Sequence, residues 1–147
     1  MFKRVLIPTD GSVVSRRAVK AGVALAKELG AKVTAYHALE VSPPYAYQDG
    51  YIVGHRAIKQ MEEKARETAR KHLAEVEKAA QAAGVTCESI MTNPSAPYRG
   101  IVDTARKKRC DVIFMASHGR GAFASLLLGN VTQKVLAHSK VPVLVYR

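Results

Sequence analysis

Residues 111–132 read DVIFMASHGRGAFASLLLGNVT, and the interpretation of the whole chain starts from this stretch. Residues 112–115 form a short apolar run typical of a buried strand, and a small polar turn at 116–119 follows it directly. After nine further residues, Gly129 and Asn130 open a segment with apolar residues at helical spacing. Glycine lets a backbone N–H approach an anion, and a helix N-terminus presents unpaired N–H groups. The stretch therefore predicts the floor of a nucleotide site.

Strand-like and helix-like segments alternate on both sides of this stretch. The strand-like segments are 2–7, 31–39, 85–92, 111–115 and 141–146. The helix-like segments follow Ser12 as far as Gly30, cover 55–83, follow the turn at 93–97 with Ser95 as a candidate cap, and cover 130–137. Strand–helix–strand units with short joints imply parallel pairing and right-handed crossovers. We expect one α/β domain over residues 1–147, with a doubly wound five-stranded parallel sheet and helices on both faces.

The polarity of the strand-like segments predicts their order in the sheet. The first, second and fourth are the most apolar, and the third (VTCESIMT) has the mixed polarity of an edge strand. We therefore place the first strand centrally and expect the order 3-2-1-4-5. The winding then reverses between strands 1 and 4, and ligands of such sheets bind outside the carboxyl ends of the strands at that point. The loops there are 8–10 and 116–119.

Helical periodicity predicts which face of each long helix is buried. On the first helix we expect the inward face to carry Val14, Ala18, Ala21, Leu25 and Leu29. On the segment 55–83 we expect one apolar stripe that carries Ile58, Met61, Ala65, Ala69, Leu73, Val76 and Ala80.

Composition narrows the class of protein. The chain has 147 residues, 48% of them apolar and 24% charged, as in an ordinary folded domain, and no apolar run approaches the ~20 residues of a membrane span. Cys87 and Cys110 have neither CxxC spacing nor a disulfide framework, so we expect two small core or near-core residues and a reducing cytoplasm.

The net charge of +11 is compatible with a nucleic acid, an anionic membrane or a small polyanion as partner. The densest basic run, 106–109, falls where a helix should end, and cations there stabilise the last turn. No aromatic residue interleaves with this run to stack on bases. We therefore interpret this run as a solvated helix end and expect no membrane partner, and binding of nucleic acid ranks third among the hypotheses.

The longest irregular stretch, 40–54, carries Pro43 and Pro44 and three tyrosines, Tyr45, Tyr47 and Tyr51. Long loops in compact domains are often lids or binding loops. The alternative is a surface connection whose tyrosines pack on the following helix.

Motif tests restrict the ligand. The chain lacks the GxxxxGK[ST] of a phosphate-binding loop ATPase. Gly119-x-Gly121-x-x-Ala124 matches a loose dinucleotide fingerprint, but no acidic residue follows about 20 residues later. Asp10, after the first strand, is the better carboxylate for ribose hydroxyls or for a metal beside phosphates. It could equally cap the first helix through the Ser12 N–H, and both roles are compatible.

The residues now suggest a family. The turn 116–119, nine residues, and Gly129-Asn130 resemble the nucleotide-binding signature of the universal stress protein family, G-x2-G-x9-G-[S/T]. The segments RVLIPTDGS, YHAL, DVIFMASHGRG, LLLGNVTQKVL and KVPVLVYR also resemble that family, in the same order and over the whole chain. This resemblance implies a flavodoxin-like domain that binds ATP, or ADP or AMP, with or without Mg²⁺. It also implies a homodimer through the last strand, from Val141 to Val145.

The resemblance also implies roles for individual residues. The matching positions are Pro8, Thr9, Asp10, Ala38, Ala116, Ser117, His118, Gly119, Arg120, Gly129, Asn130, Val131 and Thr132. Asp10 would face the ribose, and the Ala38 backbone would contact adenine. Residues 117–120 would wrap the ribose and phosphates, and residues 129–132 would hold phosphates at the helix start.

The sequence departs from the family pattern at two positions. Ala116 stands where glycine is usual, which a negative φ would tolerate, and Asn130 stands where Ser or Thr is usual. Asparagine can still cap a helix and donate through its amide. The two glycines and their nine-residue spacing remain, so we expect nucleotide binding.

Catalysis needs a positioned water and usually a base, for which His118 and Asp10 are the nearby candidates. We interpret His118 as a phosphate or loop contact. The other histidines, His37, His55, His72 and His138, form no metal-ligand spacing. We therefore expect slow or no turnover. A nucleotide-binding stress-response module is the first hypothesis, a slow nucleotide hydrolase the second, and a non-catalytic interaction protein the third.

Overall fold

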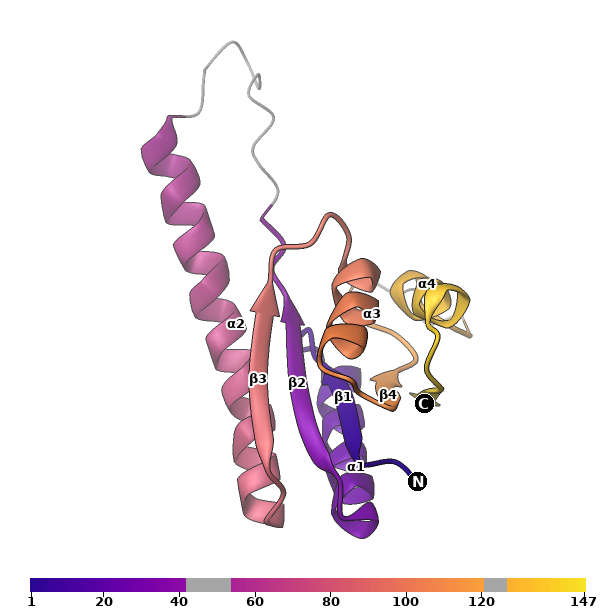
Figure 1. Ribbon diagram of the computed structural model, residues 1–147. Coiled ribbons are helices and arrows are strands. Elements are labelled where there is room, and N and C mark those ends of the chain that lie inside the picture. The colour runs from indigo at the N-terminus through magenta and orange to yellow at the C-terminus, as the bar shows by residue number, and fades with distance from the viewer. Residues whose placement is uncertain (42–53, 121–126) are drawn as a thin grey trace.

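The computed structural model describes residues 1–41, 54–120 and 127–147 (Figure 1). Its elements in chain order are β1 (Arg4–Pro8), α1 (Val13–Leu29), β2 (Lys32–Ala38), α2 (His55–Ala83), β3 (Cys87–Thr92), α3 (Pro97–Lys107), β4 (Val112–Ala116), α4 (Asn130–His138) and β5 (Val143–Tyr146). The last strand therefore begins two residues later than the sequence indicates. The tyrosine-rich stretch, with Tyr45, Tyr47 and Tyr51, lies outside the described residues.

The strands form one parallel sheet in the order β3-β2-β1-β4-β5, which confirms the predicted order and the central place of β1. Helices α1 and α2 cover one face and α3 and α4 the other, as Figure 1 shows. The chain winds from β1 outward to β2 and β3, and then crosses to β4 on the other side of β1. The carboxyl ends of β1 and β4 therefore adjoin at the point where the winding reverses.

Residues 5–7 of β1 and all of β4 are apolar, because helices cover both faces of the sheet there. On β4, Val112 and Phe114 pack with α1 and α2, whereas Ile113 and Met115 pack with α3 and α4. Leu6 of β1 likewise belongs to the second core. Side chains alternate along a strand, so a strand buried on both faces reads as a continuous apolar run.

The buried face of α1 is displaced by about one position from the predicted one. The buried residues are Ser15, Ala18, Val19, Gly22, Val23 and Ala26. Of the predicted face, Val14, Ala21 and Leu25 flank the core, and Leu29 is 41% exposed. The prediction followed the large apolar side chains, whereas Gly22 lies closest against Ile7 and Phe114 of the sheet and Ser15 is buried against the loop after β1. Gly30 ends the helix in the left-handed conformation (φ 63°), as expected.

Only the second half of α2 packs in the core. Ala69, Leu73, Val76 and Ala80 of the predicted stripe are buried, but Met61 is 43% exposed and Ile58 and Ala65 are half-buried. The first turns of α2 project beyond the carboxyl ends of β2 and β3 (Figure 1). The prediction that Ile58, Met61 and Ala65 pack in the core was therefore wrong.

Other details of the described residues qualify the sequence analysis. The N-cap of α3 is Ala96, which makes no side-chain capping bond, so Ser95 is not the cap. Pro97 starts the helix instead, and its fixed φ is suited to that position. Cys110 is buried and Cys87 is half-buried, both as free thiols. None of the described helices is long and apolar enough to cross a membrane.

Gly22 generates a stability prediction, because a β-carbon there would lie 2.9 Å from Ile7 Cδ1 and from Phe114 Cδ1. We expect Gly22→Val to lower the free energy of unfolding by about 1–3 kcal/mol through overpacking between α1 and the sheet. The exposed neighbour Ala24 supplies the matched control. Ala24→Val should cost only about 0.5 kcal/mol of helix propensity. Urea unfolding followed by circular dichroism measures both, and equal losses would contradict this packing.

Candidate functional site

The carboxylate of Asp10 joins the two loops that follow β1 and β4. Its Oδ1 accepts the N–H of Ser12 at 2.9 Å, and its Oδ2 accepts the N–H of Arg120 at 2.9 Å. The predicted contact with Ser12 is therefore present, and the Ser12 hydroxyl in turn caps α1 by accepting the N–H of Ser15. One side chain thus orders both the start of α1 and the glycine turn after β4.

Gly119 is needed because Asp10 lies so close to it. A β-carbon at position 119 would lie 2.5 Å from Asp10 Oδ2. Its φ is not among the positive ones, so space rather than conformation requires glycine here. From the sequence, this glycine is expected to admit a bound anion. In the structure, the anion that it admits is a carboxylate of the protein itself.

Hydrogen bonds keep Asp10 ionised in a half-buried position. Burial by itself would raise the pKa of its carboxyl group, but hydrogen bonds from Ser12 and Arg120 and the charge of Arg120 bring the pKa below its usual value. A carboxylate can accept about four hydrogen bonds, and these loops use one on each oxygen. Asp10 therefore retains the capacity to accept from hydroxyl groups of a ligand.

Helix α4 starts beside the same loops, and no side chain of the described residues caps its first turn with a hydrogen bond. Gly129 is the N-cap, its N–H donates to the Ser117 carbonyl at 2.7 Å, and the Thr132 hydroxyl donates to the Ala116 carbonyl at 3.0 Å. Asn130 is the first helical residue and not the cap. The first turn contains no acidic residue, and its amide N–H groups have no preceding helical carbonyl to bind. Ala116 has no positive φ, so its methyl group is accommodated as expected.

The end of β2 presents backbone groups that none of the described strands covers. The last residue of β1, Pro8, pairs with Tyr36, whose carbonyl accepts the N–H of Thr9 at 2.9 Å. Alternate residues of a strand point their N–H and C=O groups to the same side. The backbone of Ala38 therefore points past the end of β1, where it offers one donor and one acceptor.

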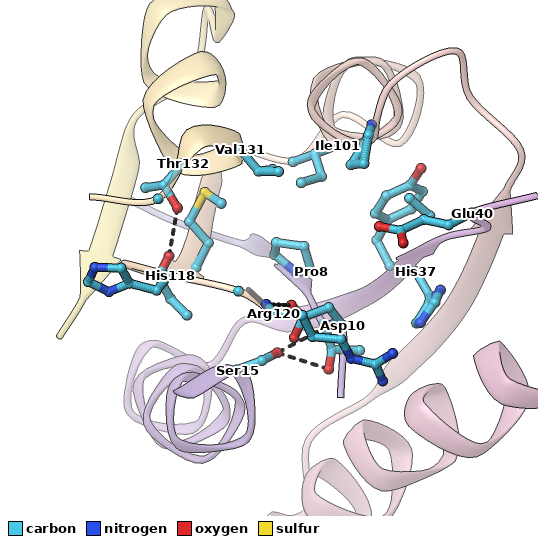
Figure 2. A pocket seen from close by; sticks show the side chains of 18 of the residues that line it. Pro8, Asp10, Ser15, His37, Glu40, Ile101, His118, Arg120, Val131 and Thr132 are labelled. Atoms are coloured by element: carbon cyan, nitrogen blue, oxygen red, sulfur yellow. Dashed lines mark hydrogen bonds between the residues drawn. The ribbon is translucent and has the colours of Figure 1, made fainter. Parts of the chain in front are cut away.

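A cavity of about 920 Å³ lies between these features, within the usual range for ligand sites. Twelve of the thirteen residues predicted for the site line it. The exception is Ser117, which is 2% exposed and whose hydroxyl pairs with His118 Nδ1 at 2.8 Å. In Figure 2, Val131 and Thr132 lie on one side of the cavity, and Asp10 and Arg120 lie on the other.

Several lining residues were not predicted. They are Ser15, Tyr36, His37, Glu40, Met61, Lys64, Ala65, Thr68, Pro97, Ile101 and Met115. Met61, Lys64, Ala65 and Thr68 belong to α2, whose first half was expected in the core. Ile101 of α3 is buried and also lines the cavity. The apolar residues in the first half of α2 could be recognised as cavity-lining only from the structure, which shows that this part of the helix projects beyond the sheet.

No cluster of three or more His, Cys, Asp or Glu side chains suited to a metal ion occurs in the described ranges. A pair of histidines does meet behind the cavity, with His37 Nε2 at 3.0 Å from His72 Nδ1. The site therefore combines the positive N-terminus of α4, the ionised carboxylate of Asp10, the unpaired backbone at the end of β2 and apolar side chains of the cavity lining. This combination suits a ligand with an anionic end, hydroxyl groups and a flat polar edge.

Comparison with known proteins is consistent with this arrangement. The model of the universal stress protein family matches residues 1–147. The universal stress protein MJ0531 of Methanocaldococcus jannaschii is 35% identical over 100% of this chain and 83% of its own length. The solved structure of MJ0577, a universal stress protein of the same organism, is 27% identical and covers 99% of this chain and 95% of its own, with a TM-score of 0.81.

A universal stress protein solved in complex with cAMP shares the fold at 24% identity, with a TM-score of 0.67 over 99% of this chain and 97% of its own. The sheet order, the loops joined at the switch point and the family model over the full length lead to one conclusion. The chain belongs to the universal stress protein family.

Proposed function

We propose that the cavity binds an adenine nucleotide, with ATP as the first candidate and ADP or AMP as alternatives, with or without Mg²⁺. In this proposal the protein is a cytoplasmic stress-response module that acts through nucleotide occupancy and dimer contacts. The observation that carries the proposal is the meeting of the Asp10 carboxylate and the uncapped start of α4 at one cavity.

The phosphates would lie at the first turn of α4. Its amide N–H groups and its positive dipole end favour an anion, and Gly129 places no side chain over them. Arg120 and Lys64 are the lysine and arginine side chains among the described residues that line the cavity. Both charges add to the attraction for a polyphosphate.

The ribose and the base would lie toward β1 and β2. Asp10 retains free lone pairs for ribose hydroxyls, as its two hydrogen bonds leave about half of its capacity. The backbone of Ala38 offers a carbonyl to the amino group of adenine and an N–H to a neighbouring ring nitrogen. The cAMP complex of the related protein concerns another chain of the same fold, and it makes an adenine ring a natural first ligand to test.

The geometry favours binding over hydrolysis. Asp10 accepts two backbone N–H groups and has a lowered pKa, which makes it a weak general base. His118 pairs with Ser117. We therefore propose slow or no turnover.

The proposed function predicts a thermal shift on addition of Mg-ATP. Ligand at about 100 times its dissociation constant should stabilise the native state by about 2.7 kcal/mol. For a domain of this length the midpoint should rise by roughly 5–10 °C. Differential scanning fluorimetry with ATP, ADP, AMP and adenosine measures the effect. If millimolar ATP, ADP and AMP all leave the midpoint unchanged, the proposal is wrong.

A second prediction concerns Gly119. Gly119→Val places a side chain against Asp10 Oδ2 and forces the two loops apart, so the ATP-dependent shift should disappear. The matched control is Gly54→Val, because no described residue lies within 4 Å of a β-carbon added at Gly54. The control should keep the full shift. A Gly119→Val protein that responds to ATP like the control would argue against these loops as the site.

We also propose a homodimer through the last strand, from Val141 to Val145. Strand β5 is an edge of the sheet, and Leu144 and Tyr146 are 39% and 36% exposed on it. An unpaired edge with exposed apolar side chains favours pairing with a second copy.

Sedimentation velocity tests the dimer. The wild type should sediment as a dimer and Leu144→Lys as a monomer, because a buried lysine at the interface would lose its hydration. Leu29→Lys changes an equally exposed leucine at the end of α1 and should leave the dimer intact. A monomeric wild type, or equal behaviour of the two variants, would refute this interface.

A further inference from the structure

The side chain of Arg120 lies on the α2 side of the cavity. Its main-chain N–H binds Asp10, but its Nη2 lies 3.4 Å from Nε2 of His72 on α2. Val131 and Thr132 lie at the start of α4, and Figure 2 shows the guanidinium of Arg120 directed away from them. A guanidinium is the preferred side-chain partner of a phosphate. Here it is held at the opposite side from the proposed phosphate position.

The chemistry of the groups fixes the direction of this contact. Arginine can only donate, so His72 Nε2 must accept and a neutral His72 must carry its proton on Nδ1. That Nδ1 lies 3.0 Å from His37 Nε2, which must then accept in turn. His37 therefore carries its proton on Nδ1, a buried atom with no hydrogen-bond partner among the described residues. Arg120, His72 and His37 form a directed chain of two hydrogen bonds.

The surroundings keep both rings neutral. His72 is 8% exposed and lies directly against Gly11, where any β-carbon would overlap the ring. Burial lowers the pKa of His72, and the charge of Arg120 lowers it further. Burial and the neighbouring ring likewise lower the pKa of His37. The titratable and charged groups that face the pair are Arg120, Glu75, Arg16 and Asp10.

Within this set, Glu75 and Arg16 pair with each other, with Arg16 Nε 2.7 Å from Glu75 Oε2. Asp10 is already bound to the backbone of both loops. Arg120 is therefore the charge whose position depends most directly on the state of His72.

We propose that His72 is a positioning residue for Arg120: the neutral ring holds the guanidinium on the α2 side of the cavity, and a proton on the His37–His72 pair releases it to the phosphates of a bound nucleotide. A protonated His72 has N–H donors on both nitrogens, so it loses the acceptor and gains a like charge. Phosphate binding therefore tightens as the pH falls below the ordinary histidine pKa of about 6.5. The second half of this inference, the release of Arg120 to the phosphates, rests on the proposed nucleotide function; the first half, the hold of His72 on Arg120, does not.

The first half is tested without any nucleotide. Long-range ¹H–¹⁵N spectra of the full-length labelled protein report the tautomer and the pKa of each histidine. At pH 7.5 we expect the Nδ1–H tautomer for His72 and His37, and a pKa of His72 below about 6.5. Arg120→Met should release the Nδ1–H tautomer of His72 and raise its pKa. Lys64→Met removes the other cation of the cavity and should leave His72 unchanged. An Nε2–H tautomer of His72, or no response to Arg120→Met, would overturn the proposal.

The second half is tested by calorimetric titration with ATP and with adenosine at pH 7.5. We expect His72→Phe, which keeps a ring but has no acceptor, to bind ATP about fivefold more tightly and adenosine as before. His72→Gln retains an acceptor and should behave as the wild type. In the Arg120→Met background, His72→Phe should have no effect on ATP. Equal effects on ATP and adenosine, or an effect that persists without Arg120, would refute the coupling.

The two arms separate this inference from the proposed function. If the wild type binds no ATP, the proposed function fails and the release of Arg120 to phosphates fails with it. The spectra then still decide whether His72 positions Arg120. If ATP binds but the variants show no coupling, the proposed function stands and the role of His72 is refuted.

Discussion

The site depends on one carboxylate held between two loops. Asp10 accepts an N–H from the turn before α1 and another from the turn after β4, so these chain segments, 110 residues apart in sequence, are fixed to each other. Gly119 admits the carboxylate because it has no side chain. This contact sets the glycine turn against the end of β1. The strand order places both loops at the switch point, and the contact fixes them to each other beside the cavity.

Much of the fold could be predicted because local patterns decide it. The apolar runs of β1 and β4 and the mixed polarity of β3 sufficed to place central and edge strands. What periodicity missed depends on tertiary geometry. It placed Leu29 in the core and missed the buried Ser15 and Gly22, because large apolar side chains dominate a periodicity count. Periodicity could not show that α2 extends beyond the sheet, since apolar residues that line a cavity and apolar residues that pack in the core have the same helical spacing.

For the candidate site, the sequence likewise predicted the backbone loops but not the side-chain contacts. The spacing of Gly119 and Gly129 and the place of Asp10 after a strand identified the lining loops. The reason given for Gly119 was incomplete, because the nearest anion is Asp10. The contact of Arg120 with His72 was beyond sequence analysis, since it joins residues 48 positions apart through a side-chain orientation that no local pattern encodes. Family membership supplies the fold and the expected class of ligand, and the contacts of these residues supply the mechanism.

The central claim is that an adenine nucleotide lies between Asp10 and the start of α4. A crystal structure of the full chain grown with saturating Mg-ATP tests it directly. The account predicts phosphate oxygens within hydrogen-bond distance of the first-turn amides of α4, ribose hydroxyls at the Asp10 carboxylate, and the base edge at the Ala38 backbone. An empty crevice, or a nucleotide bound elsewhere on the molecule, would contradict it.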